Sequence, residues 1–325
     1  MFNMQFVGLP LFKRGRVQDV YSMGDDLLML ASDRVCCFGV ILPTSIPGKG
    51  KLLTAMSAHW FSVMADLAPN HLLARTDDDY PAICHGSREQ WEGRSVWVRH
   101  ATPAPFVCVV RGYLFGSAWQ EYRERGRVSG IRLPKGLAEA ARLAQPVFIA
   151  CIKTASGEGG EEITFAEMAA RIGMTRAKKM REVSIAVYLR ARDLAQARGI
   201  IIAETKLQFG FADDETILID ELLTADSSRF WLAEDYQPGK TPESYDTDYL
   251  RDYLNSVNWD RRPPVPTLPP EIIGKMQKKY QEVLRRLTAS PNECLDVEES
   301  KAMGMIPGEA KPAIANETTQ IPGQF

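Results

Sequence analysis

The stretch that most constrains how this chain can fold lies at residues 199–219. It reads GIIIAETKLQFGFADDETILI, two runs rich in β-branched residues on either side of an acidic turn at 212–215. Runs of this kind, bounded by glycine and aspartate, are typical of a β-hairpin. We therefore expect two antiparallel strands joined by this turn.

Charged and polar side chains gather on the predicted hairpin and directly after it. They are Glu204, Lys206 and Gln208 on the first strand, Asp220 and Glu221 at the end of the second, and Asp226, Ser227 and Arg229 in the loop beyond. Because side chains alternate along a strand, the three on the first strand share one face. Carboxylates with a nearby lysine and arginine suit a site for a divalent cation and phosphates. A solvated hairpin with surface ion pairs is the alternative.

Composition and charge narrow the class of protein. A length of 325 residues is enough for a large core in two lobes, and a net charge of −2 gives no argument for nucleic acid or an acidic membrane. No apolar run approaches the roughly 18–20 residues that span a bilayer, and residues 1–15 lack the pattern of a signal peptide. We therefore expect a cytoplasmic protein with no nucleic-acid or membrane partner, and we leave its oligomeric state open.

The cysteines and histidines do not form a ligand pattern. The six cysteines are at positions 36, 37, 84, 108, 151 and 294, and none are spaced as C-x-x-C. We interpret them as reduced thiols and not as a zinc site or a disulfide framework. The four histidines, at 59, 71, 85 and 100, are scattered, so we interpret them as structural or exposed.

Apolar periodicity predicts the remaining elements. Strands are expected as an antiparallel meander over residues 10–42 and at 71–74, 95–98 and 106–110. Helices are expected at 52–67, 164–173, 175–198, 244–257 and 271–287, with Thr164 and Glu167 as a capping box for the second. Residues 123–162 are polar and are interpreted as loops, and the stretch from about 289 as a weakly ordered tail.

Three other places could hold an anion. Gly15 lies in a turn between Arg14 and Arg16, and Lys49 and Lys51 lie in a Pro- and Gly-rich loop before a helix. Arg111 ends an apolar run and is followed by Ser117 at the expected start of a helix. Arginine presents a planar fork that suits phosphate or carboxylate. An exposed hairpin, solvated lysines and a structural ion pair are the respective alternatives.

Taken in order, these segments resemble the SAICAR synthetase (phosphoribosylaminoimidazole-succinocarboxamide synthase) family, from about Phe12 to Leu287. The stretches that carry the resemblance are RGRVQDVY (14–21), ASDRV (31–35), SIPGKGKLLT (45–54), VVRGYLFGSAWQEY (109–122), TKLQFG (205–210) and DELLTADSSRFW (220–231). Several long motifs in the family's order make the resemblance specific.

The resemblance implies an α+β fold of two lobes: a strand-rich N-terminal lobe over residues 1–108 and a larger, ATP-grasp-like mixed lobe over 109–288, with a tail at 289–325. The nucleotide is expected in the cleft between the lobes. The implied activity is an ATP-dependent ligation in purine biosynthesis. It joins the carboxylate of an aminoimidazole ribonucleotide to the amine of L-aspartate, with Mg²⁺, through an acyl phosphate.

The resemblance also implies a role for each matching residue. Arg14, Gly15, Arg16 and Val17 match the loop over the ATP phosphates, Lys49 matches a lysine beside the nucleotide, and Glu221 lies beside the metal position on the ATP side. Lys206, Glu204 and Asp220 match the catalytic positions, with Asp220 and Gln208 at the magnesium site. Arg111, Ser117, Asp226, Ser227 and Arg229 match the clamp on the ribonucleotide.

The chain departs from the family pattern at charged positions of the site. The family's loop usually reads G-K-[VA]-[RK], whereas here Gly15 is followed by Arg16, Val17 and Gln18, so one cation is lost. In the D-x-K-x-E-F-G motif, Glu204 is one methylene longer than Asp, and Gln208 supplies a neutral amide. We therefore keep two alternatives: a divergent paralogue acting on a related purine-type ribonucleotide in nucleoside-analogue biosynthesis, and a non-catalytic nucleotide-binding protein.

Overall fold

The predicted hairpin lies in the larger of two main sheets. The computed structural model describes residues 8–73, 80, 84, 88–154, 160–262 and 264–289. The strands of this sheet are β7 (Thr102–Leu114), β10 (Ala141–Ile152), β11 (Glu162–Ile163), β12 (Ile200–Ala212), β13 (Glu215–Ile219) and β14 (Ser228–Leu232). Their order is β11-β10-β7-β12-β13, with β14 also paired to β12, and every pairing is antiparallel. The predicted hairpin, β12 and β13, is confirmed.

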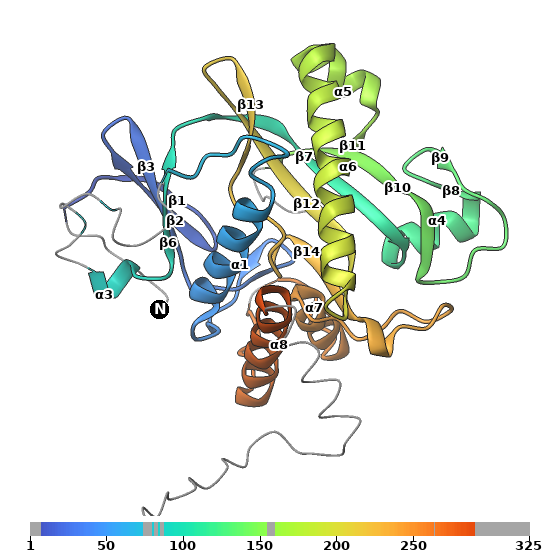
Figure 1. The fold of residues 1–325 in the computed structure, drawn as a ribbon. Coiled ribbons are helices and arrows are strands. Elements are labelled where there is room, and N and C mark those ends of the chain that lie inside the picture. Colours follow the sequence, from blue (N-terminus) through green and yellow to red (C-terminus); the bar gives the residue numbers. More distant parts are fainter. Residues whose placement is uncertain are drawn as a thin grey trace, which may run out of the picture. The chain divides into compact units, whose positions relative to one another are not determined.

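A second sheet forms the N-terminal part of the fold (Figure 1). Its strands are β1 (Leu11–Arg14), β2 (Gln18–Met23), β3 (Asp26–Ala31) and β6 (Ser95–Arg99), paired antiparallel in that order. This confirms the predicted meander. Two short hairpins, β4 (Cys36–Cys37) with β5 (Val40–Ile41) and β8 (Arg127–Val128) with β9 (Ile131–Arg132), complete the strands of the described residues.

The predicted boundary between the two lobes, at residues 108 and 109, falls in the middle of β7. The chain passes from the smaller sheet to the larger one at residues 100–101. Both sheets belong to one compact unit that ends at Thr288. The predicted tail, apart from Ala289, lies outside the described residues.

Helices flank both sheets. They are α1 (Lys49–Val63), α3 (Arg88–Trp91), α4 (Gly116–Arg125), α5 (Phe165–Ile172), α6 (Met174–Gln196), α7 (Thr247–Ser256) and α8 (Pro270–Thr288), with a 3-10 turn at Ala233–Asp235. The capping box of Thr164 and Glu167 at the start of α5 is confirmed. No helix in the described part of the chain is both long enough and apolar enough to cross a membrane. Mixed helices and antiparallel sheets give the α+β class that was expected.

One long strand was missed. The interpretation of residues 123–162 as loops was wrong for β10, which pairs with β7 over much of its length. Pro146 lies in this strand, and the pairing register shifts between Arg142 and Val147 around it. Proline cannot donate to a strand ladder, so its presence is normally a signal against a central strand. Because Pro146 lies where the pairing with β7 is interrupted, the strand does not need a backbone donor at that position.

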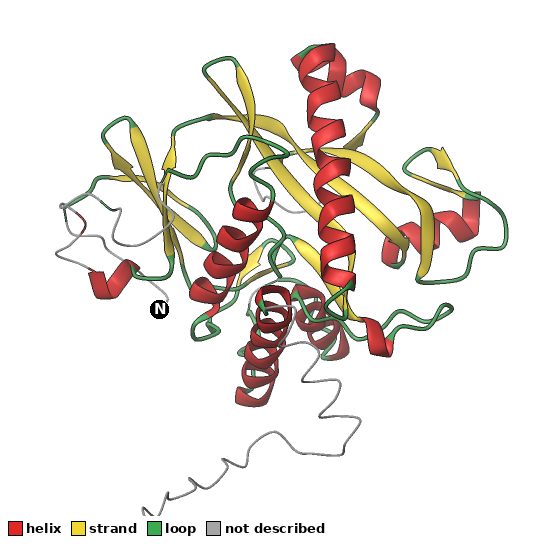
Figure 2. Cartoon of the chain, viewed as in Figure 1, coloured by secondary structure: helices red, strands yellow, loops and turns green. Residues whose placement is uncertain are grey.

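The main core forms where α6 packs on the larger sheet. Figure 2 shows this long helix crossing the strands. The buried side chains of α6 form one apolar cluster with those on the sheet face that it covers. Tyr188 of α6 is fully buried and its hydroxyl donates to the carbonyl of Ile202 at 2.9 Å. This hydroxyl lies directly over Gly112 of β7, where a Cβ would overlap it. The close approach of helix and sheet therefore requires glycine at 112.

We predict that Gly112→Ala lowers the free energy of unfolding by about 2–4 kcal/mol, because the methyl group displaces the Tyr188 hydroxyl in a packed core. Gly274→Ala is the matched control. Gly274 lies inside α8, and a Cβ added there would meet no atom of the described residues within 4 Å, so alanine should stabilise the helix by about 0.5–1 kcal/mol. Urea unfolding of both variants measures the difference, and equal stabilities would contradict the packing described.

Candidate active site

A bulge in β12 creates the charged face of the larger sheet. The strand's pairing with β14 shifts between Ile202 and Glu204. Before the bulge, Ile200 and Ile202 point into the main core, and beyond it Leu207 points to the same side. Glu204 therefore lies on the opposite face, away from α6. If side chains alternated strictly along β12, Glu204 would instead share the face of Ile202. Bulges of this kind re-aim a side chain beside a functional site.

The bulge places Glu204 between two arginines. Its direct neighbours are Arg111 on β7 and Arg229 on β14, so the three side chains form a row across three adjacent strands. An ion pair joins Arg111 to Glu204. Burial by itself would raise the pKa of Glu204, but Arg111, Arg229 and Lys206 hold that pKa below its ordinary value. The row and Lys206 together carry a net positive charge, which favours an anionic ligand.

Arg111 keeps donor capacity for such a ligand. One of its terminal nitrogens, Nη1, donates to the carbonyl of Phe115 at 3.3 Å, and the guanidinium carbon lies 5.2 Å from the centre of the Phe115 ring. Its Nε is buried and has no hydrogen-bond partner among the described residues. Ser117 lies two residues beyond Phe115, exposed in the first turn of α4. The predicted pair of Arg111 and Ser117 is thus presented at the start of one helix.

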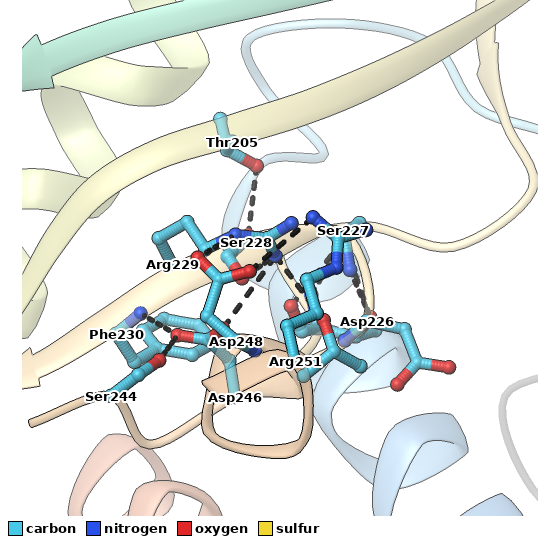
Figure 3. Close-up of polar contacts among 12 residues, drawn as sticks. Thr205, Asp226, Ser227, Ser228, Arg229, Phe230, Ser244, Asp246, Asp248 and Arg251 are labelled. Carbon is cyan, nitrogen blue, oxygen red and sulfur yellow. Dashed lines mark hydrogen bonds and ion pairs between the residues drawn. The ribbon is translucent and has the colours of Figure 1, made fainter. Parts of the chain in front are cut away.

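Arg229 is held more tightly by its own chain (Figure 3). It is 4% exposed, its Nε lies 2.8 Å from Asp248 Oδ2, and its Nη1 lies 3.6 Å from Asp246 Oδ1. Asp246 also accepts hydrogen bonds from the Ser244 hydroxyl at 2.5 Å and the Phe230 amide at 2.8 Å. Burial raises the pKa of Asp246 to about 7 despite the nearby guanidinium of Arg229. These carboxylates fix Arg229 in the row.

The sequence predicted that Lys49 lies in a loop, but the structure places it in a helix. It is the first residue of α1 and is 0% exposed, and its amine lies 2.5 Å from Asp226 Oδ2. The other oxygen of Asp226 accepts a hydrogen bond from the Tyr280 hydroxyl of α8 at 3.3 Å. The structure therefore joins a residue predicted for ATP, Lys49, to one predicted for the ribonucleotide, Asp226.

Ser227 turns inward beside Asp226. Its hydroxyl accepts a hydrogen bond from the Thr224 amide at 3.0 Å, and its carbonyl accepts one from the Lys206 amide at 2.8 Å. These contacts hold the loop after β13 against β12. The predicted clamp is therefore not one cluster of ligands: Arg111 and Arg229 share a row, while Asp226 and Ser227 are bound to other parts of the chain.

The predicted phosphate loop is a tight connection between β1 and β2. The Gly15 amide donates to the Gln18 carbonyl at 2.8 Å, and a Cβ on Gly15 would lie 2.6 Å from that oxygen. Buried Arg34 donates to the carbonyls of Gly15 and Arg16 at 3.0 and 2.8 Å. Arg14 is exposed, 3.7 Å from Asp19. The Gly15 amide is therefore engaged within the turn, and the loop leaves the exposed Arg14 side chain at the edge of the smaller sheet, with Arg16 half-buried beside it.

A cavity lies between this loop, α1 and the end of β13. Its lining residues are Val17, Gln18, Met29, Ala31, Leu53, Thr54, Ser57, Arg94, Val96, Asp220 and Glu221. Glu221 accepts a hydrogen bond from the Thr224 hydroxyl at 2.7 Å. Burial, together with the charges of Asp226 and Asp220, raises the pKa of Glu221 to about 8. One wall of the cavity is apolar and the other is acidic.

The donors around Asp220 do not fit a resident divalent cation. The amide nitrogens of Gln18 and Gln208 both donate to its carboxylate, whereas Mg²⁺ requires oxygen ligands. No group of three or more His, Cys, Asp or Glu side chains that could hold a metal occurs in the described residues. The structure thus brings Asp220 and Gln208 together, as predicted, but as acceptor and donor.

Several residues of this site were not singled out from the sequence. They are Arg34 behind the phosphate loop, His71 beside Asp220, Asp246 and Asp248 around Arg229, and Tyr280 beside Asp226. Gln18, which donates to Asp220, was noted in the sequence only as a departure from the family's loop pattern. The contacts of the other residues are long-range, and local patterns do not encode them.

This fold and site define a class: an α+β protein with a row of charged side chains on its central sheet and a cavity beside a glycine loop. The family model for SAICAR synthetase matches residues 11–266. The chain therefore belongs to the SAICAR synthetase family.

Known members of the family are similar to this chain over most of their length. The phosphoribosylaminoimidazole-succinocarboxamide synthase of Desulfosudis oleivorans is 47% identical over 284 residues, 87% of this chain and 97% of the relative. That of Geobacter sulfurreducens is 46% identical over 288 residues, 89% of this chain and 97% of the relative. The structure of the Saccharomyces cerevisiae SAICAR synthase complexed with SAICAR matches with a TM-score of 0.79 at 36% identity, covering 89% of this chain and 98% of that one.

We predict that Lys49→Met lowers the free energy of unfolding by about 3–5 kcal/mol, because it removes a buried cation and leaves the half-buried carboxylate of Asp226 without its partner. Lys51→Met is the matched control: Lys51 is exposed two residues further along α1, so its loss should change stability little. Chemical denaturation of the two variants makes the comparison. Equal effects would contradict the buried ion pair.

We also predict a pH-dependent contribution from Asp246. Its pKa is raised from 3.8 to about 7 on folding, so the folded state holds a proton that the unfolded state has lost between these pH values. Its contribution to stability is therefore full below about pH 4 and declines as pH rises to about 7, by at most about 1.4 kcal/mol per pH unit. The difference in unfolding free energy between wild type and Asp246→Asn should fall over this range. A difference independent of pH would contradict the raised pKa.

Proposed function

We propose that this chain is an ATP-dependent carbon–nitrogen ligase that forms SAICAR, joining the carboxylate of a carboxyaminoimidazole ribonucleotide to the amine of L-aspartate. Its membership of the SAICAR synthetase family supports this reaction. The observation that carries it to particular residues is the row of Arg111, Glu204 and Arg229 across three strands of the central sheet. Arg111 and Lys206 on this face suit a phosphorylated, carboxylated substrate.

The row would hold the ribonucleotide, with Arg111 as the contact to its anionic groups. The unpartnered Nε of Arg111 and its position beside the start of α4 support this role. Lys206 follows Glu204 on the same face of β12, and its cation would lie near charge that develops on the reacting carboxylate. Arg229, whose charge Asp246 and Asp248 balance, would keep Glu204 and the row in place and would not act as a flexible contact.

The nucleotide would occupy the cavity beside the Gly15 loop. Val17, Leu53 and Val96 offer an apolar wall for a base, and Val17 and Gln18 bring the end of the Gly15 loop to the cavity's edge. A Mg²⁺ ion would arrive bound to the phosphates of ATP and lower their charge during transfer. We also propose that the reaction takes place in the cytoplasm.

A second candidate is ligation on a related purine-type ribonucleotide. The longer Glu204 side chain, paired to Arg111, and the neutral Gln208 favour it, because both alter the charged groups on the face where the reacting carboxylate would lie. Purified protein with ATP, L-aspartate and the carboxyaminoimidazole ribonucleotide separates the two. ADP release with formation of the succinocarboxamide supports SAICAR synthesis. ADP release only with another ribonucleotide supports the alternative, and binding without turnover would contradict both.

Arg111→Met should lower kcat/KM for the ribonucleotide by roughly 10–100-fold, the loss expected when one charged hydrogen bond worth about 1.5–3 kcal/mol is removed. Arg125→Met is the control, since Arg125 is exposed in the last turn of α4. Steady-state kinetics at saturating ATP and aspartate give the ratio, with thermal unfolding to verify that both variants are folded. An unchanged kcat/KM would rule out the assignment of Arg111.

A further inference from the structure

Two glutamines from different sheets meet on one carboxylate. Gln18 is the first residue of β2 in the smaller sheet, and Gln208 lies in β12 of the larger one. The amide nitrogen of Gln18 donates to Oδ1 of Asp220 at 2.7 Å, and that of Gln208 donates to Oδ2. Each glutamine therefore engages a different oxygen of the same side chain. Asp220 is the acceptor that links the two sheets at this point.

The backbone of Asp220 is fixed independently of these amides. Its φ of +68° lies in the left-handed region, which is costly for a residue other than glycine. The ring of His71, 2% exposed, hydrogen-bonds to this backbone from the core side. The end of β13 just before it is also held, because the Leu218 carbonyl accepts a hydrogen bond from the His71 amide at 3.1 Å. The carboxylate is thus aimed at the two glutamines by a strained and well-supported turn.

We propose that Gln18 and Gln208 are a matched pair of positioning residues that hold Asp220 as a hydrogen-bond acceptor between the sheets, and that Asp220 is not a ligand for a divalent cation in this chain. The inference rests on the proposed function only in that Gln18 and Asp220 line the cavity assigned to the nucleotide. A cation carried there on the phosphates would meet Glu221, the neighbouring carboxylate of the same wall.

The charge of Asp220 and its two amide partners explains why both glutamines are needed. One carboxylate with two neutral amides carries a single negative charge, and both of its oxygens already receive N–H groups. Replacing either glutamine by glutamate would place two carboxylates in contact, which repel one another and together form a site that a cation would neutralise. Each glutamine presents an N–H group where a glutamate would present an oxygen. This difference therefore decides whether the Asp220 carboxylate accepts hydrogen bonds or takes part in binding a metal ion.

The test needs no nucleotide. Thermal unfolding of the full chain is measured in EDTA and in millimolar Mg²⁺ for wild type, Gln208→Glu and Gln18→Glu. Gln281→Glu is the control, because Gln281 is exposed on α8 and the substitution adds the same charge there. For wild type and for Gln281→Glu, the unfolding temperature should be the same in EDTA as in Mg²⁺. Each variant beside Asp220 should unfold roughly 3–6 °C lower in EDTA and recover at least half of that loss in Mg²⁺.

The proposal would be overturned if Mg²⁺ without nucleotide raised the unfolding temperature of wild type and did not raise that of Asp220→Asn. This comparison can be made even if the glutamate variants fail to fold. As a second measurement, calorimetry compares ATP affinity in Mg²⁺ and in EDTA. The ratio should be the same in wild type and Asp220→Asn, and a lower ratio in the variant would also overturn it. Absence of ATP binding in either solution would count against the proposed nucleotide site, while the Mg²⁺ result without nucleotide would still stand.

Discussion

The ion pair between Glu204 and Arg111, and the bulge that makes it possible, is the interaction on which the site depends. Without the bulge, Glu204 would share a face with Ile202 and would be buried beneath α6, where an ionised carboxylate has no partner. With it, the same strand supplies apolar side chains to the core on one face and charged side chains to the site on the other. The strand thereby positions the site and supports the core at once.

Burial of so many charges is possible only because each is compensated by a residue from another part of the chain. Arg229 is balanced by Asp246 and Asp248 at the start of α7, and Asp226 by Lys49 at the start of α1 and the Tyr280 hydroxyl of α8. A buried ion pair adds little net stability over apolar packing, but it is costly to break. The last helix and the first helix are therefore parts of the site and not only supports for it.

Asp220 gives a different solution to the same problem. Its charge is met by two neutral amides and by the more distant amines of Lys153 and Lys13. Positions 18 and 208 are both departures from the family's pattern, and the structure brings them to one carboxylate. The two changes are separate in the sequence but form a single local environment, which is why we treat them as one feature of this chain.

Much of the fold could be predicted because its signals are local. The hairpin of β12 and β13, the meander of β1 to β3 and the capping box of α5 follow from β-branched runs, turn residues and a three-residue spacing. The alternation of Glu204, Lys206 and Gln208 also placed them correctly on one face. The strand β10 was missed because Pro146 is a local signal against a strand, and only its pairing with β7 outweighs that signal.

The sequence by itself determined the family, the α+β class and the residue types of the site, since these depend on motifs and on neighbours along the chain. Only the tertiary structure decided which charges meet: that Glu204 lies between Arg111 and Arg229, that Lys49 binds Asp226 instead of standing free in a loop, and that two glutamines occupy Asp220. The physical reason is that the partner of a buried charge is set by strand register and helix packing, and both join residues that are far apart in the sequence.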